Sequence, residues 1–227
     1  MLPFLVDPAW PACFPGARMG VLEARGLAAL PTHPGLEEAR LDLEAELRAR
    51  YGSMDRRQLR ELPTFRAFEA HYRRFGKTYH VLPQLESVAS KGRSIPARIC
   101  AVTALFMAEL RHGLVAAGHD LALVEPPLRL APSSRGETYT NLGRTEAALP
   151  DGDMTLRHAK GLLSSVLHGP DLATPIGPST RDALFTIYAP AGVPEGALEA
   201  ELDDLAGFLA CFAPGAGIER AILPARS

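Results

Sequence analysis

The stretch IPARICAVTALFMAELRHG (95–113) determines how the rest of the chain is interpreted. Its residues are apolar on nearly every side of a 3.6-residue period, and a glycine closes it. A helix without a polar face must be surrounded by other elements. A glycine directly after the last periodic residue is a common helix end. The stretch therefore predicts a central buried helix that ends at Gly113.

The segments around this helix divide into two kinds. Helices are predicted over 36–52, over a short segment capped by Ser53 and stopped at Pro63, and over 64–76, 83–92 and 195–212. Strands are predicted over 19–25, 121–132, 137–143, 161–167, 182–190 and 218–224. Helices first, strands next and a helix last indicate an α+β protein whose helices pack on a central mixed sheet. We expect the central helix to lie on a sheet that contains 137–143 and 182–190.

Composition limits the classes of protein that need to be considered. The chain has 227 residues, 47% of them hydrophobic, and no low-complexity linker, which predicts one globular domain over 1–227. No apolar run approaches the ~20 residues of a membrane helix, and the first residues do not form a basic leader. The three cysteines are widely spaced and lack metal-type pairing. These features predict a cytoplasmic protein without a membrane partner, and no cofactor motif is present.

A basic segment stands out against a net charge of −2. Between residues 54 and 77 there are seven Lys or Arg residues and three acidic ones, interleaved with aromatic residues. Arg66, Arg73 and Arg74 are the candidates for contact with RNA phosphates. The alternative is an amphipathic helix with its aromatic side chains turned inward and its arginines solvated.

Three stretches follow one another in a recognisable order. The first is a buried helix containing Val-Thr, then a glycine, then a short segment ending in Asp120. The second, LRLAPSSRGETYTNLGRTEAAL (128–149), has a Gly-Glu-Thr turn between two strands, and the third is GPSTRDALFTIYAP (177–190). From about residue 65 to 190, this succession resembles the B3/B4 domain, the tRNA-editing module of the phenylalanyl-tRNA synthetase beta chain, in a freestanding form.

The resemblance implies a mixed α/β fold and the handling of aminoacyl-tRNA. In the synthetase this domain hydrolyses mischarged tyrosyl-tRNA: a pocket holds the amino acid, and a bound water attacks the ester. The pocket histidine of the family falls on Ala117 in this chain, and His119 lies two residues later. The stretch GLLSSVLHGPD (161–171) corresponds to the family's Gly-rich segment but contains no glutamate.

Candidate site residues gather in SSVLHGPDLATP (164–175). His168 and Asp171 are the candidate catalytic pair, because an aspartate can fix the tautomer of a histidine that activates water. The alternative is a turn in which Asp171 bonds its own backbone and His168 is partly exposed. Ser164 and Ser165 are small enough to form a pocket floor, and His119 is a further candidate contact.

Glu137 follows a glycine at a turn, where it can either enter a pocket or stand on a hairpin edge. No metal site is expected, because the histidines and Asp171 lack a recurring ligand spacing. Two functions remain open on the sequence alone. One is a hydrolase that deacylates mischarged tRNA in trans. The other is a module that binds tRNA, an amino acid or another small ligand without catalysis.

Overall fold

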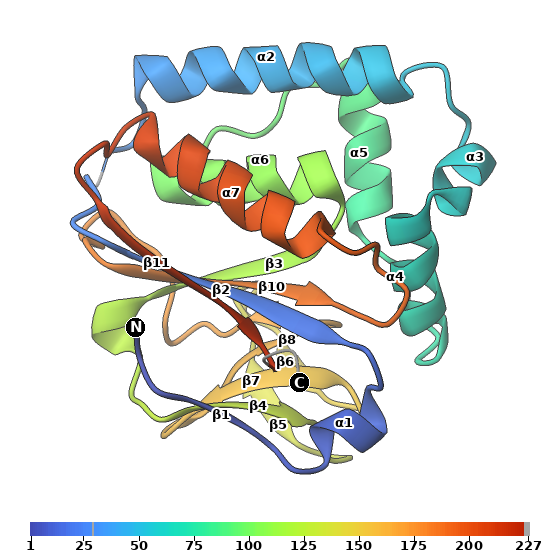
Figure 1. The fold of residues 1–227 in the computed structure, drawn as a ribbon, viewed down its shortest axis with the longest axis vertical. Coiled ribbons are helices and arrows are strands. Elements are labelled where there is room, and N and C mark those ends of the chain that lie inside the picture. Colours follow the sequence, from blue (N-terminus) through green and yellow to red (C-terminus); the bar gives the residue numbers. More distant parts are fainter. Residues whose placement is uncertain (29, 225–227) are drawn as a thin grey trace.

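The computed structural model describes residues 1–28 and 30–224. It is built in three layers: helices, a four-stranded sheet and a five-stranded sheet (Figure 1). The helices are α1 (Trp10–Cys13), α2 (Pro34–Tyr51), α3 (Arg56–Glu61), α4 (Pro63–Arg73), α5 (Val81–Ala89), α6 (Cys100–His112), the 3-10 turn η1 (Leu121–Leu123) and α7 (Ala197–Ala210). No helix within these described residues is long and apolar enough to cross a bilayer.

The four-stranded sheet lies directly beneath α6 and α7 (Figure 1). Its strands are, in spatial order, β11 (Gly217–Leu223), β2 (Arg18–Arg25), β10 (Ala183–Ala189) and β3 (Val115–Asp120), and all neighbours are antiparallel. All seven residues of β10 are buried. A strand buried on both faces has a nearly continuous apolar sequence rather than an alternating one, which is why the sequence DALFTIYAP predicts a strand.

The five-stranded sheet lies on the other side of the four-stranded sheet from α2, α6 and α7 (Figure 1). Its order is β1 (Phe4–Val6), β4 (Leu128–Pro132), β7 (Met154–His158), β8 (Gly161–Ser165) and β9 (Gly169–Pro170). The sheet is mixed, because β1 runs parallel to β4 while the other pairs are antiparallel. The α+β class predicted from the sequence is therefore confirmed.

The sequence predicts that the segment 137–143 joins the sheet on which α6 lies, and this prediction is wrong. Only β5 (Thr138–Thr140) forms there, and it pairs with β6 (Glu146–Ala148) in a separate two-stranded ribbon. Both strands have three residues, and most of their side chains face solvent. Strands this short have too little apolar surface to enter a buried sheet.

Helix α6 is the central buried helix, and it ends at Gly113 as predicted. Gly113 is left-handed, with a φ of +75°, and its N–H bonds the carbonyl of Glu109. A Cβ at this position would lie 3.0 Å from the Phe65 ring. The position therefore favours glycine for its backbone conformation and for the space that Phe65 leaves.

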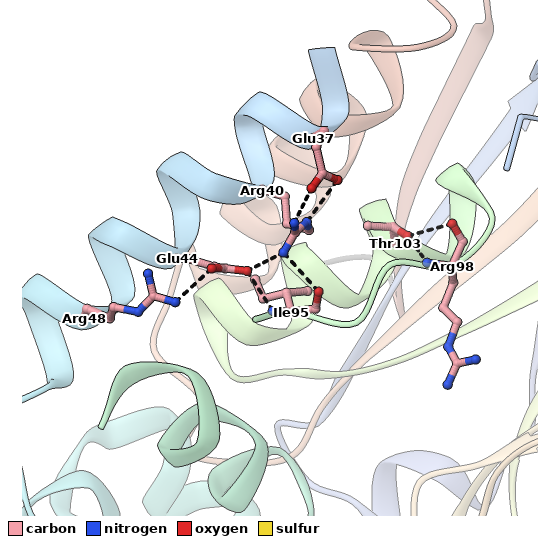
Figure 2. Close-up of polar contacts among 7 residues, drawn as sticks. All are labelled: Glu37, Arg40, Glu44, Arg48, Ile95, Arg98 and Thr103. Atoms are coloured by element: carbon pink, nitrogen blue, oxygen red, sulfur yellow. Dashed lines mark hydrogen bonds and ion pairs between the residues drawn. The ribbon is translucent and has the colours of Figure 1, made fainter. Parts of the chain in front are cut away.

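The predicted helix starts five residues too early, because Ile95 is bonded to α2 and Arg98 to the Thr103 side chain instead (Figure 2). The buried carboxylate of Glu44 accepts the N–H of Ile95 at 2.8 Å, and Arg40 donates to the Ile95 carbonyl at 3.2 Å. Thr103 Oγ1 accepts the N–H of Arg98 at 2.8 Å, while the Arg98 guanidinium points away from Glu44. These contacts hold the segment before α6 in a non-helical conformation, so the helix begins at Cys100.

Two smaller elements complete the scaffold. The cap of α3 is Asp55 rather than Ser53: its carboxylate accepts the N–H of Gln58 at 2.8 Å, and the Gln58 side chain accepts the N–H of Asp55 at 2.8 Å. Helix α1 packs against β4 and buries Trp10, whose ring centroid lies 4.6 Å from that of Phe14.

Candidate functional site

A pocket of about 680 Å³ opens where the β7–β8 turn, η1 and the β5 strand meet. Its polar lining includes Tyr139, His158, Lys160 and Asp171, and apolar residues such as Leu162 complete the wall. The β5 ribbon is fixed to residues 170–172 by backbone bonds. One of them joins the N–H of Leu172 to the Thr140 carbonyl at 2.9 Å. This tie makes one wall out of two segments that are far apart in the sequence.

Asp171 belongs to a buried chain of hydrogen bonds that runs back from the pocket. The Thr174 hydroxyl donates to Asp171 Oδ1, and it lies 2.8 Å from Nδ1 of the fully buried His119. Because the hydroxyl proton is committed to Asp171, the His119 Nδ1 must donate to Thr174. His119 also lies on β3 in the other sheet, so the chain of bonds joins the two sheet layers.

The charge of Asp171 follows from these contacts. Burial raises the pKa of this carboxyl, but the contact with His119 at 3.6 Å and the hydrogen bond from Thr174 outweigh that effect and hold the pKa below its usual value. Asp171 is therefore an anion at neutral pH, and it is one of the residues that line the pocket.

His158 presents a defined tautomer to the same pocket. Its Nδ1 accepts the N–H of Glu125 at 3.2 Å. Burial lowers the pKa of this imidazole, an effect that Asp171 partly opposes, so the ring is neutral at neutral pH. With Nδ1 as an acceptor, the proton of the neutral ring is on Nε2. His158 thus offers a hydrogen-bond donor to a ligand and not a basic lone pair.

The stretch SSVLHGPDLATP is a tight hairpin. β8 and β9 pair through Ser164 with Pro170 and Ser165 with Gly169, and Gly169 has a φ of +76°. Ser165 donates to the buried Asp153 at 2.5 Å, and its Oγ accepts the N–H of His168 at 3.1 Å. These hydrogen bonds stabilise the turn from its buried side.

Ser164 is equally occupied. Its hydroxyl lies 2.7 Å from that of Tyr188, and both residues are fully buried. On the opposite side, the Tyr139 hydroxyl donates to the carbonyl of Gly169 at 2.7 Å. Both serines therefore serve the packing of the hairpin behind the pocket wall.

His168 and Asp171 do not form the pair expected from the sequence, because the hairpin turns them to different surroundings. The imidazole partner of Asp171 is His119. His168 is half-buried; burial is the first cause that lowers its ring pKa, and Lys77 adds to it. Its Nε2 is buried without a hydrogen-bond partner among residues 1–28 and 30–224.

Glu137 is held on the hairpin edge, the second of its two possible positions. It accepts two hydrogen bonds from Arg157, at 2.9 and 2.7 Å, and the N–H of Ser134 at 2.8 Å. The Arg157 contact lowers the pKa of Glu137. Glu137 is not among the residues that line the pocket.

The structure thus brings His119 and Asp171 together and adds residues that sequence reasoning missed. Those are His158, Tyr139 and Thr174. The signals available were the histidine just before the Ala-Lys-Gly turn and the threonine three residues after Asp171. Among the described residues, no group of three or more histidine, cysteine or acidic side chains is arranged to hold a metal ion.

The aromatic residues of the basic segment are turned inward. Phe65, Phe68, Tyr72 and Tyr79 are buried, as the amphipathic-helix alternative requires. Arg66 and Arg73 line a groove between α3 and α4, whereas the Arg74 guanidinium lies 5.4 Å from the centre of the Phe75 ring.

Comparison with solved structures gives information on the fold. No family model matches the chain, and no curated protein matches it. A solved structure that is similar is an N-terminal fragment of the phenylalanyl-tRNA synthetase beta-subunit from Pyrococcus horikoshii, with a TM-score of 0.50 and 12% sequence identity. The match covers 100% of this chain and 55% of that fragment. The expected resemblance to this beta chain is therefore confirmed at the level of the fold.

Proposed function

We propose that the chain handles aminoacyl-tRNA and that the pocket receives the aminoacyl end, where a mischarged ester is hydrolysed. The observation that carries this proposal is the pairing, in one pocket, of an anionic Asp171 with the Nε2–H of a neutral His158. An aminoacyl ester has a free ammonium group beside an ester carbonyl. The two side chains match these two groups in charge and in hydrogen-bonding capacity.

The chemistry assigned to the residues is recognition followed by hydrolysis. Asp171 binds the ammonium group, and His158 donates to the carbonyl oxygen, on which negative charge develops. Water adds to the carbonyl carbon and the bond from that carbon to the ribose oxygen breaks. One proton of the water passes to the ribose oxygen and the other to solvent, and the amino acid leaves as a carboxylate. His119 and Thr174 act as positioning residues for Asp171.

A non-catalytic binding module is the second candidate, and one observation favours it. The His158 ring has its Nδ1 lone pair occupied by Glu125, and Asp171 is held by Thr174 and His119. Neither group is a free base for a water molecule. A pocket of this kind recognises an ammonium compound equally well without cleaving it.

The test is release of amino acid from a panel of correctly and wrongly charged tRNAs. We expect wild-type protein to deacylate at least one mischarged tRNA, Asp171→Asn to raise KM, and His158→Ala to lower kcat by about 10²-fold. The sequence-based candidates His168→Ala and Glu137→Ala are the matched controls and should stay close to wild type. Absence of deacylation by the wild type would overturn hydrolysis. Equal rates in all five proteins, or loss confined to His168→Ala, would move the reaction away from this pocket.

A further inference from the structure

The groove between α3 and α4 is a basic surface. It has a volume of about 530 Å³ and is lined by Arg56, Arg57, Arg60, Arg66 and Arg73, with Glu61, Glu69 and Ala70. On α4, Arg66 and Arg73 are seven residues apart and therefore lie on one face. The tight Leu62–Pro63 connection between the helices sets the arginines of α3 opposite that face.

The arginines of the groove fall into two groups. Arg56 pairs with Glu86 of α5, and Arg60 with Glu69 at 3.3 Å. Arg57, Arg66 and Arg73 are exposed, and no acidic side chain pairs with any of them in the part of the chain that the structure describes. The ion pairs of Arg56 and Arg60 stabilise the helices that form the groove. The other three guanidinium groups are available to bind an external anion.

The aromatic residues of the same segment define which anion fits. Proteins that hold single-stranded RNA stack its bases on exposed aromatic rings. Here Phe65, Phe68, Tyr72 and Tyr79 are buried, and Phe75 is half-buried with Arg74 over its ring. The groove therefore offers charge without a stacking platform. Arginines alone suit the phosphates of a double helix, whose bases are already stacked.

We infer that this groove binds the phosphate backbone of a double-helical RNA stem, through Arg57, Arg66 and Arg73. The inference rests on the proposed function for the choice of RNA, since a tRNA is largely double-helical. It adds a second contact, independent of the pocket. Because the net charge of the chain is −2, binding depends on this local surface and not on the whole molecule.

The test is fluorescence anisotropy with a 16-base-pair RNA duplex and with either of its single strands. We expect the duplex to bind more tightly and log Kd to rise with log salt with a slope of about 3, for three phosphate contacts. Arg66→Glu/Arg73→Glu should weaken binding by at least about tenfold and reduce the slope by about 2. The assay measures RNA binding alone. Its result therefore stands whether or not the protein deacylates tRNA.

The matched control is Arg135→Glu/Arg181→Glu, which makes the same change in charge at two exposed arginines outside the groove. Circular dichroism establishes that both variants are folded. The control should keep near-wild-type affinity. Equal loss in the two variants, tighter binding of the single strand, or preferential displacement of the duplex by polyglutamate would each overturn the inference.

Discussion

Individual residues in this chain carry charge states that differ from those of the same residues in water. Glu109 of α6 and Glu201 of α7 are both buried, and burial is the main cause that raises the pKa of each. The N–H of Ala116, which donates to Glu109 at 2.9 Å, opposes this only in part, and the pKa of Glu109 reaches about 7. The charge of Glu109 raises the pKa of Glu201 further.

Because of Glu109, we expect the free energy of unfolding to fall as the pH rises from about 4.5 to about 7. The unfolded chain loses this proton near pH 4.5, whereas the folded protein keeps it up to about pH 7. Between these values the unfolded state binds fewer protons, so the free energy of unfolding decreases as pH rises and levels off above pH 7. The loss is on the order of 3 kcal/mol at 1.36 kcal/mol per pKa unit.

Glu109→Gln should remove that part of the pH dependence, because the amide oxygen can still accept the Ala116 N–H. Urea unfolding at pH 4.5 and pH 8 measures the effect, with the exposed Glu38→Gln as the control. The variant should gain stability relative to wild type at pH 8 and not at pH 4.5. Parallel curves for wild type and Glu109→Gln would contradict the assignment.

At the scale of elements, the stability of helix α6 depends on the glycine that ends it as well as on the side chains that it buries. Gly113→Ala forces an alanine into left-handed backbone and sets its Cβ 3.0 Å from Phe65. Gly16 has a similar φ of +79° with nothing within 4 Å of a built Cβ, so Gly16→Ala isolates the backbone effect. We expect about 1 kcal/mol of destabilisation for Gly16→Ala and more for Gly113→Ala, measured by urea unfolding. Equal losses would show that Phe65 moves aside freely.

The elements that the sequence predicted well are those whose signal lies within consecutive residues. The periodic run of α6 and the apolar run of β10 are of this kind. The strand β3, VAAGHD (115–120), escaped notice because it consists of small residues without alternation. The role of His158 depends on Glu125, 33 residues away, and that of Asp171 on His119 in another sheet. Such pairings arise from sheet topology, which no local pattern encodes.

At the scale of the whole molecule, the three layers should differ in local stability. β10 is buried throughout and paired on both sides, whereas β5 and β6 form an exposed ribbon. Amide hydrogen exchange should therefore be slowest in β10 and β2 and fastest in β5 and β6, since the core opens only with global unfolding. A β10 that exchanges as fast as β5 would contradict this arrangement.

The position of Trp10 gives the molecule a built-in optical probe. It is the one tryptophan in the sequence, and it is buried on the short helix α1 beside β4, in the layer of the five-stranded sheet. Its emission therefore reports on that layer, while the far-ultraviolet signal of the molecule is dominated by helices on the opposite side. If the two spectroscopic transitions coincide during unfolding, the sheets and the helices melt as one unit; if they separate, the difference measures how strongly the layers are coupled.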